Sequence, residues 1–293
     1  MAKVKKRHRT LPQIDEDDVE ESGPKRGNKL LSAEEVLGRM KSASDIELFI
    51  KILAYGRSGT GKTAFASTLP KPIFYVDLGD KGTDTIRHLS DEEVRIFPVH
   101  DWNDIESVYW FLKDGGYKQF PTVVLDTITQ MQNKYGMPEV KVREGRHPSD
   151  PMTTPLWGAL SGLMKEWTDY FNDLPMNVCF LAQDRRDNSN DDTDYDDEDL
   201  LPEFGPQLMP SVAKSVNAAV NFIGQTFIKK VTKQKNGKII RRAEYRMRLG
   251  PHPLYLTKTR KPPQFKVPDS IKNPSYEKIM AIARGEAPQD GEE

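Results

Sequence analysis

One short stretch of the chain has the residue types and the spacing needed to hold a polyphosphate. It reads Gly56-Arg-Ser-Gly-Thr-Gly-Lys-Thr63 and fits the pattern GxxxxGK(S/T) at every fixed position. Glycines allow backbone N–H groups to converge on phosphate oxygens, and the lysine adds a positive charge beside them. The pattern predicts a P-loop that takes a nucleoside triphosphate, with ATP and Mg²⁺ as the expected ligands.

The side chains of this loop have separate expected roles. Lys62 is expected to reach the β- and γ-phosphates, and the hydroxyl of Thr63 is expected to ligate Mg²⁺. The predicted cradle for the nucleotide consists of Gly56, Arg57, Ser58, Gly59, Thr60, Gly61, Lys62, Thr63 and Ala64.

A second candidate for the metal site is Asp126, which ends the apolar segment Thr122 to Leu125. A carboxylate at the end of a parallel strand would lie beside the P-loop and hold Mg²⁺ through a water, which is the Walker B role. The alternative is a cap for a turn or helix that begins at Thr127.

The elements that must position these residues alternate between strands and helices. Strands are expected over 47–55, 72–77, 94–99, 121–126 and 177–183, with helices over 62–69, 104–113 and 155–171. The strand before Asp126 is apolar on both faces, as a buried parallel strand should be. The order predicts an α/β fold with a mostly parallel sheet flanked by helices.

The C-terminal part predicts an antiparallel β-hairpin. Segments 221–228 and 238–249 flank Asn236-Gly237, a strong hairpin signal, after an expected helix over 210–221. The division expected along the chain is a disordered charged tail (1–29), a short helical lead-in capped by Ser32 (30–45), an ATPase core (46–266), and a short helix with an acidic tail (267–293).

Bulk composition excludes several classes of protein. The formal net charge is −1, so any nucleic-acid surface must be a local patch. The single cysteine, Cys179, rules out a disulfide framework or a cysteine zinc site within one chain, and it is expected to be a buried apolar residue. No segment approaches the roughly 20 apolar residues needed to cross a bilayer. We therefore expect a soluble, cytoplasmic protein without a membrane partner.

The order of these motifs resembles the RecA-like ATPases, over about residues 46–260. Val124-Leu-Asp-Thr127 resembles their Walker B segment, and Phe180-Leu-Ala-Gln183 resembles the strand whose Gln senses the γ-phosphate and opens a DNA-binding loop. The closest subgroup is the phage-type RecA-like nucleotide-binding proteins, which include single-strand annealing proteins of the Sak group. In phage, the location would be the host cytoplasm.

The same resemblance implies a role for Lys258-Thr-Arg260. In RecA-like rings or filaments, basic residues in this region complete the ATP site of a neighbouring subunit. Arg260 is therefore a candidate catalytic residue in a homo-oligomer. The alternative is an exposed, basic strand end.

The sequence departs from the RecA-like pattern at the general base. The family carries a Glu after the second strand, but Tyr75-Val-Asp-Leu-Gly79 has Gly at that position. Asp80 takes the role if the position shifts by one residue, and Asp77 is the other candidate. The alternative for Asp80 is a turn residue in Gly-Asp-Lys-Gly. Hydrolysis would then be slow or depend on another acid.

The hairpin is strongly basic, which suits single-stranded DNA. Phe227 and Tyr245 are either stacking platforms or core residues, and the lysines alternatively protect an exposed edge strand. Segment 134–147 matches the position of a DNA-facing loop, whereas 191–199 holds seven acidic residues in nine and would repel phosphates. The basic residues of the hairpin are Lys229, Lys230, Lys233, Lys235, Lys238, Arg241, Arg242, Arg246 and Arg248.

The leading hypothesis from the sequence is an ATPase that acts on single-stranded DNA in annealing or recombination, with a single-strand-binding protein as a further candidate partner. Two alternatives are a partner-dependent P-loop motor and a nucleotide-gated binding module with little turnover. A nucleotide kinase ranks lower, because the arginine-rich lid motifs of such kinases are not recognisable.

Overall fold

The computed structural model describes residues 31–42, 45, 47–80, 82–186, 204–235 and 238–289, and the chain forms two compact units, 1–47 and 48–293. In the first unit, helix α1 (Ala33–Arg39) begins at a capping box: Ser32 Oγ accepts from the Glu35 N–H, and the Glu35 carboxylate accepts from the Ser32 N–H. The short helix predicted for this segment is confirmed. The expected tail 1–29 and the acidic run 191–199 lie outside the described residues.

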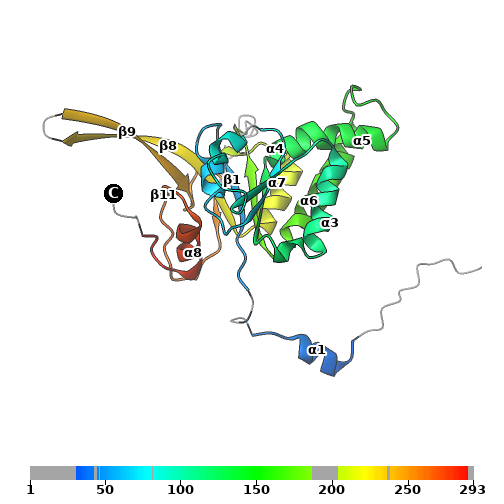
Figure 1. The fold of residues 1–293 in the computed structure, drawn as a ribbon, viewed down its shortest axis with the longest axis horizontal. Helices are drawn as coiled ribbons and strands as arrows, with labels where there is room; N and C mark the ends of the chain where they lie inside the picture. Colours follow the sequence, from blue (N-terminus) through cyan, green and yellow to red (C-terminus); the bar gives the residue numbers. More distant parts are fainter. Residues whose placement is uncertain are drawn as a thin grey trace, which may run out of the picture. The chain divides into compact units, whose positions relative to one another are not determined.

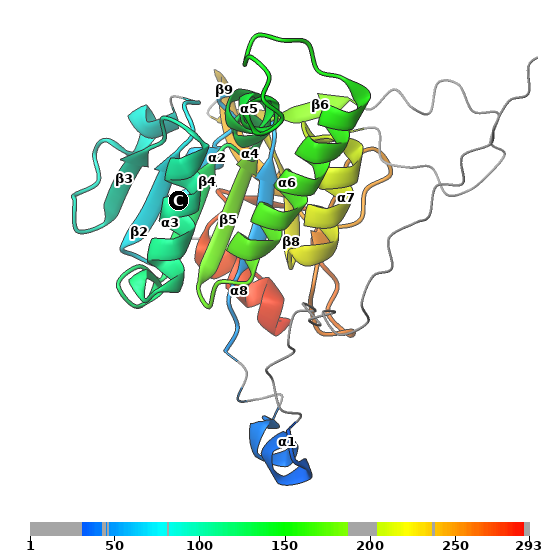
Figure 2. The same cartoon turned by 90° about the vertical axis from the view of Figure 1, so that its right-hand side faces the viewer.

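The second unit is built on one large, mostly parallel sheet (Figure 2). Five of its parallel strands stand in the order β1-β5-β4-β2-β3, with β3 at the edge of the sheet. Their bounds are β1 (Lys51–Tyr55), β2 (Ile73–Asp77), β3 (Val94–Pro98), β4 (Thr122–Asp126) and β5 (Asn177–Ala182). The predicted parallel sheet is confirmed. Strand β5 lies between the P-loop strand and the strand of Asp126, which brings the end of β5 to the middle of the site.

Helices cover both faces of this sheet. Alternate residues of β1 supply the two cores, since Leu53 and Tyr55 face one core while Ile52 and Ala54 face the other. The first core is covered by α3 (Trp102–Lys113), α6 (Thr154–Asn172) and α7 (Pro210–Ala219), and the second by α2 (Lys62–Ala66) and α8 (Tyr276–Arg284). Within the described ranges, no helix combines the length and the apolar character needed to cross a membrane.

Helix α2 is shorter than predicted and ends at Ala66 instead of Leu69. The hydroxyls of Ser67 and Thr68 bond back to the carbonyls of Ala64 and Phe65, at 2.8 and 2.7 Å. Such local bonds compete with continuation of the helix.

The expectation of a loop over 134–147 is wrong for most of that segment. The chain is helical there, through α4 (Ile128–Gln130), a π-helical turn η4 (Met131–Gly136) and α5 (Met137–Arg143). Met131, Tyr135 and Val140 are buried in the core, and this roughly helical spacing was the available signal. Pro138 is tolerated because it lies in the first turn of α5.

The predicted hairpin is present, and its first strand belongs to the main sheet. Strand β8 (Phe222–Lys235) pairs in parallel with β1 over Phe222–Gln225, then continues outward with β9 (Lys238–Arg248) as an antiparallel pair (Figure 1). Strands β10 (Lys258–Thr259) and β11 (Ser270–Lys272) add to β8 and β9. A separate small sheet pairs β6 (Asp184–Arg186) with β7 (Phe204–Pro206), and 3-10 turns occur at η2 (Gly82–Ile86) and η3 (Gly116–Lys118).

Candidate nucleotide-binding site

The loop between β1 and α2 has the backbone that its glycines were expected to allow. Gly59 and Gly61 have φ angles of +78° and +90°, in the left-handed region that glycine adopts without a steric cost. Gly61 is also the N-cap of α2, so the loop leads directly into the residues Lys62 and Thr63.

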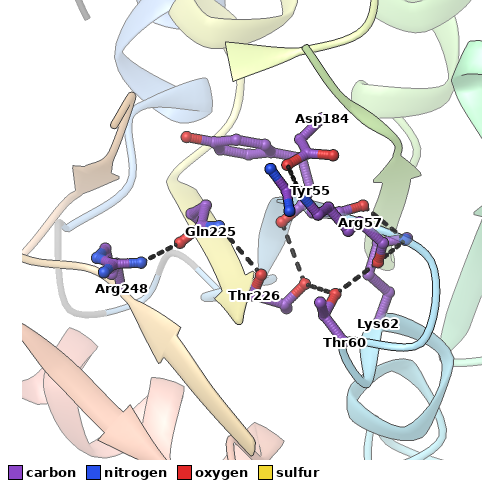
Figure 3. A network of polar contacts seen from close by, with 9 residues as sticks. Tyr55, Arg57, Thr60, Lys62, Asp184, Gln225, Thr226 and Arg248 are labelled. Carbon is purple, nitrogen blue, oxygen red and sulfur yellow. Dashed lines mark hydrogen bonds and ion pairs between the residues drawn. The ribbon is translucent and has the colours of Figure 1, made fainter. Parts of the chain in front are cut away.

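The amino group of Lys62 is held inside this loop. Its Nζ donates to the carbonyl oxygens of Gly56 at 2.8 Å and of Arg57 at 3.0 Å (Figure 3). The side chain is buried, and burial lowers the pKa of Lys62, while the carboxylates of Asp126 and Asp80 oppose that shift. A phosphate oxygen would have to replace these carbonyls as the partner of Nζ.

Thr63 and Asp126 lie together, as the sequence predicted. The Thr63 hydroxyl donates to Asp126 Oδ2 at 3.2 Å, and the Tyr75 hydroxyl donates to the same oxygen. Asp126 is buried, and this burial raises its pKa. A hydroxyl and a carboxylate are hard oxygen donors, which suit Mg²⁺ completed by phosphate oxygens and water. The described residues hold no cluster of three or more His, Cys, Asp or Glu that would form a separate metal cage.

Gly82 lies next to the oxygen atoms of Thr63 and Asp126, and it was not identified as a site residue from the sequence. A Cβ at Gly82 would stand 2.4 Å from Asp126 Oδ2 and 2.8 Å from Thr63 Oγ1. Only a residue without a side chain therefore leaves the pair accessible. The sequence showed this glycine simply as part of a Gly-Asp-Lys-Gly turn.

Asp80 and Gln183 are brought together from two distant parts of the chain. Gln183 Nε2 donates to Asp80 Oδ2 at 2.7 Å, and burial raises the pKa of Asp80. Asp77, the other candidate base, accepts the N–H of Gly79 at 2.8 Å and so closes the turn after β2. Asp80 lines the cavity beside the P-loop, whereas Asp77 is not among its lining residues.

A cavity of about 650 Å³ lies beside the P-loop and reaches Asp80 and Asp126. Of the predicted site residues, its wall contains Ser58, Gly59, Gly61, Lys62, Thr63, Ala64, Asp80 and Asp126. The remaining lining was not predicted for this site, and it consists of Phe65, Thr68, Gly82, Thr85, Tyr245, Asn273, Pro274 and Ser275.

The P-loop rests against the hairpin strand β8. The hydroxyls of Thr60 and Thr226 are hydrogen-bonded at 2.7 Å, and the Thr226 hydroxyl donates to the Tyr55 carbonyl at 3.2 Å (Figure 3). A Cβ at Gly56 would stand 2.4 Å from Thr226 Oγ1. On the outer side, the exposed Arg57 lies 3.7 Å from the Asp184 carboxylate.

The two aromatic residues of the hairpin differ in surroundings. Tyr245 is 45% exposed and its ring lies against Gly61, with Cδ1 3.1 Å from the position of a Cβ there, so it is not a core residue. Phe227 is half-buried below the guanidinium of Arg248, which lies 3.8 Å from the centre of the Phe227 ring and 4.3 Å from that of Tyr255.

Lys258 and Arg260 lie at the end of α7 and outside the cavity wall of their own chain. Lys258 Nζ donates to the carbonyls of Asn217 and Ala218, at 2.6 and 2.9 Å, and Arg260 Nη2 donates to Ala218 at 3.5 Å. Cations at a helix C-terminus satisfy its last carbonyls. The exposed Arg260 thus has a structural partner, and its role in a neighbouring subunit stays a prediction.

Comparison with known proteins supplies the family. The AAA domain family matches residues 48–261, from just before β1 to just beyond Arg260. Among solved structures, the flagellar accessory protein FlaH from Methanocaldococcus jannaschii is similar at 10% identity and a TM-score of 0.35, over 68% of this chain and 78% of that one. This likeness identifies no function, and comparison with curated proteins gave no match. Because the family match spans most of the sequence, the chain belongs to the AAA domain family.

Proposed function

We propose that the protein binds ATP with Mg²⁺ in this cavity and hydrolyses it to ADP and phosphate. The observation that carries the proposal is the convergence of the Thr63 hydroxyl and the Asp126 carboxylate, 3.2 Å apart, beside Lys62. Backbone N–H groups of the loop would hold the phosphates, and Lys62 would turn from its loop carbonyls to the β- and γ-phosphates. Thr63 and Asp126 would hold the metal ion, which supplies positive charge to the phosphate oxygens.

Asp80 is the proposed general base in this site. Gln183 occupies one oxygen of its carboxylate, Oδ2, so that Oδ1 is left to accept a proton from the attacking water. Burial raises the pKa of Asp80 toward the range in which a base works at neutral pH. Gln183 then acts as a positioning residue, because it fixes the orientation of the Asp80 carboxyl group.

We further propose that the ATPase acts on single-stranded DNA, in annealing or recombination. The exposed side chains of Lys229, Lys230, Arg241 and Arg242 support this, since the structure describes no ion pair between them and other described side chains. Positively charged arms of this kind follow the backbone of a single strand. The resemblance to phage-type annealing proteins points the same way.

An oligomer is part of the same proposal. Arg260 is exposed, so it is available to the ATP site of a neighbouring copy in a ring or filament. A single-strand-binding protein as a partner, and action in the cytoplasm of a host cell, rest on the resemblance to phage-type proteins alone.

A second candidate function is a nucleotide-gated binding module with little turnover. Its support is the Gly79 that stands where the family carries the catalytic Glu, together with the use of Asp77 in the turn. In such a module, ATP would order the hairpin without rapid hydrolysis.

The test measures ATP hydrolysis with and without single-stranded DNA, using Lys62→Ala as the control. Stimulation by DNA that is lost in the variant supports a DNA-dependent ATPase. Binding of ATP without stimulation contradicts the DNA-dependent reading and favours the gated module. Turnover that persists in Lys62→Ala would place the chemistry outside the P-loop and refute the proposal.

A further inference from the structure

Part of the cavity wall consists of residues to which the phosphate site assigns no role. Tyr245 from β9 and the segment 273–275 after β11 line it, together with Phe65 and Thr68 of the α2 region. The volume of about 650 Å³ lies in the range of sites for whole small ligands. If the P-loop holds a triphosphate, as proposed above, the rest of the same molecule must lie against these residues.

Tyr245 offers an aromatic surface beside the phosphate loop. Its ring lies against Gly61, yet almost half of the residue is exposed at 45%. An aromatic ring at such a position stacks on any base, because every base has a π-face. Ile228, directly opposite Tyr245 in the ladder, is similarly exposed at 42% but does not line the cavity.

Asn273 places a side-chain amide next to that ring. Its backbone N–H donates to the Tyr245 carbonyl at 2.8 Å, and its φ of +45° is a left-handed conformation that Asn tolerates better than most residues. The exposed side chain lines the cavity, and the structure describes no hydrogen bond from it to another described residue.

The wall that carries Asn273 is fixed at the start of α8 and to the turn that follows α2. The N–H of Tyr276 donates to Thr68 Oγ1 at 3.0 Å, and Ser275 caps α8 by accepting from the N–H of Lys278. A wall fixed in this way can present a hydrogen-bonding group in one orientation.

We propose that Tyr245 and Asn273 form a nucleobase subsite that prefers adenine to guanine. Tyr245 would stack on the base, and the Asn273 amide would read its edge. Adenine offers a donor at N6 and an acceptor at N7, which match the oxygen and the NH₂ of one amide. Guanine offers two acceptors, O6 and N7, so one amide cannot satisfy both in the same way.

The experiment measures Mg²⁺-dependent binding of ATP, GTP and inorganic tripolyphosphate by calorimetry. Tripolyphosphate probes the P-loop without a base. Tyr245→Ala is expected to weaken ATP binding about tenfold, within the range for loss of one stacked base, and to leave tripolyphosphate binding unchanged. Tyr245→Phe should retain ATP binding, and Ile228→Ala is the matched control that should bind all three ligands like the wild type.

Asn273→Gly removes the amide while tolerating the left-handed backbone. This variant should lose most of the preference for ATP over GTP. An equal loss of ATP and tripolyphosphate binding in Tyr245→Ala, or an unchanged ATP affinity, would overturn the base subsite while leaving the P-loop proposal intact. If the wild type binds neither ATP nor tripolyphosphate, the proposed function itself fails.

Discussion

The two ends of the hairpin β8–β9 differ in burial, although they belong to one continuous ladder. At the inner end, Gln225, Thr226 and Met247 are buried, and Thr226 contacts the P-loop. At the outer end, Lys229, Lys230 and Arg241 are exposed on an arm that extends beyond the main sheet (Figure 1). The same pair of strands thus contacts the P-loop at one end, where Tyr245 of β9 lines the cavity, and forms a charged projection at the other.

The basic residues of the hairpin divide along the same line. The inner arginines have protein partners: Arg246 donates to the Glu244 carboxylate at 2.9 Å, and Arg248 donates to Gln225 Oε1 at 2.6 Å. The outer Lys230 and Arg242 have no such partner among the described residues. Counting positive charges in the sequence therefore overestimates the charge available to a phosphate backbone.

The largest expected effect comes from Asp126→Asn, which removes the carboxylate beside Thr63 in the cavity. We expect ATP hydrolysis to fall by about 100-fold or more, because charge stabilisation at the transferred phosphate is lost. Binding of single-stranded DNA to the outer arm should persist. Steady-state assays measure ATP hydrolysis, and fluorescence anisotropy measures DNA binding by the same variant. Equal loss of both activities would contradict separate roles for the two ends of the hairpin.

The same variant should be more stable than the wild type at neutral pH. Burial raises the pKa of Asp126 in the folded protein above its value in the unfolded chain. Protonated Asp126 therefore stabilises the folded state fully below its unfolded-state pKa, and this stabilisation is lost as the pH rises through its folded-state pKa. An asparagine carries no charge at any pH, and its oxygen still accepts from Thr63 and Tyr75. Thermal unfolding should show an advantage for Asp126→Asn at pH 7 that disappears at acid pH.

Removing the outer charges should have the next largest effect. Replacement of Lys229, Lys230, Arg241 and Arg242 by Ala is expected to weaken single-strand binding about tenfold or more at low salt. The slope of log affinity against log salt should become shallower by roughly 3, at about 0.7 per phosphate contact. Lys214→Ala, which removes an exposed cation from α7, is the control. A salt slope equal to that of the wild type would show that DNA binds elsewhere.

The pH dependence of hydrolysis tests whether Asp80 is the general base in the cavity. Its pKa is raised by burial and its active form is the carboxylate, so hydrolysis should fall about tenfold per pH unit once the pH drops below that pKa. On the alkaline side, the lowered pKa of Lys62 predicts weaker ATP binding as its charge is lost. Asp80→Asn should be slow and lack the acidic limb. An acidic limb that survives in this variant would assign the base to another residue.

The smallest effect concerns the contact that joins the hairpin to the loop. Thr226→Val keeps the shape of the side chain but removes its hydrogen bonds to Thr60 and the Tyr55 carbonyl. We expect a loss of about 1 kcal/mol in the free energy of unfolding and slightly weaker ATP binding. Chemical denaturation measures the first quantity. Unchanged stability together with unchanged ATP affinity would mean that the two hydroxyls do not couple the hairpin to the P-loop.

Local signals in the sequence were sufficient for one part of this molecule. The P-loop motif predicted Lys62 and Thr63, and apolar runs predicted β4 and β5 with Asp126 and Gln183 at or just after their ends. These features depend on neighbours along the chain, such as strand length, flanking glycine and a polar residue after an apolar run.

The remaining features depend on contacts that span the chain. Asp80 meets Gln183 across 103 positions, and Thr60 meets Thr226 across 166. The steric demand on Gly82, in the turn η2, comes from Asp126 at the end of β4. Tyr245 of β9 reaches Gly61 only because β9 pairs with β8 and β8 aligns with β1. A single sequence carries no local signal for such pairings, so these contacts required the folded structure.

The most direct test of the account is calorimetric binding of ATP, with and without Mg²⁺, to three proteins. They are the wild type, Lys62→Ala, and the variant with Ala at the four outer positions of the hairpin. We predict Mg²⁺-dependent binding to the wild type and to the outer variant, and loss of binding in Lys62→Ala. Equal binding of ATP to the wild type and Lys62→Ala, or no binding to the wild type, would contradict the claim that the cavity beside the inner end of the hairpin is a nucleotide site.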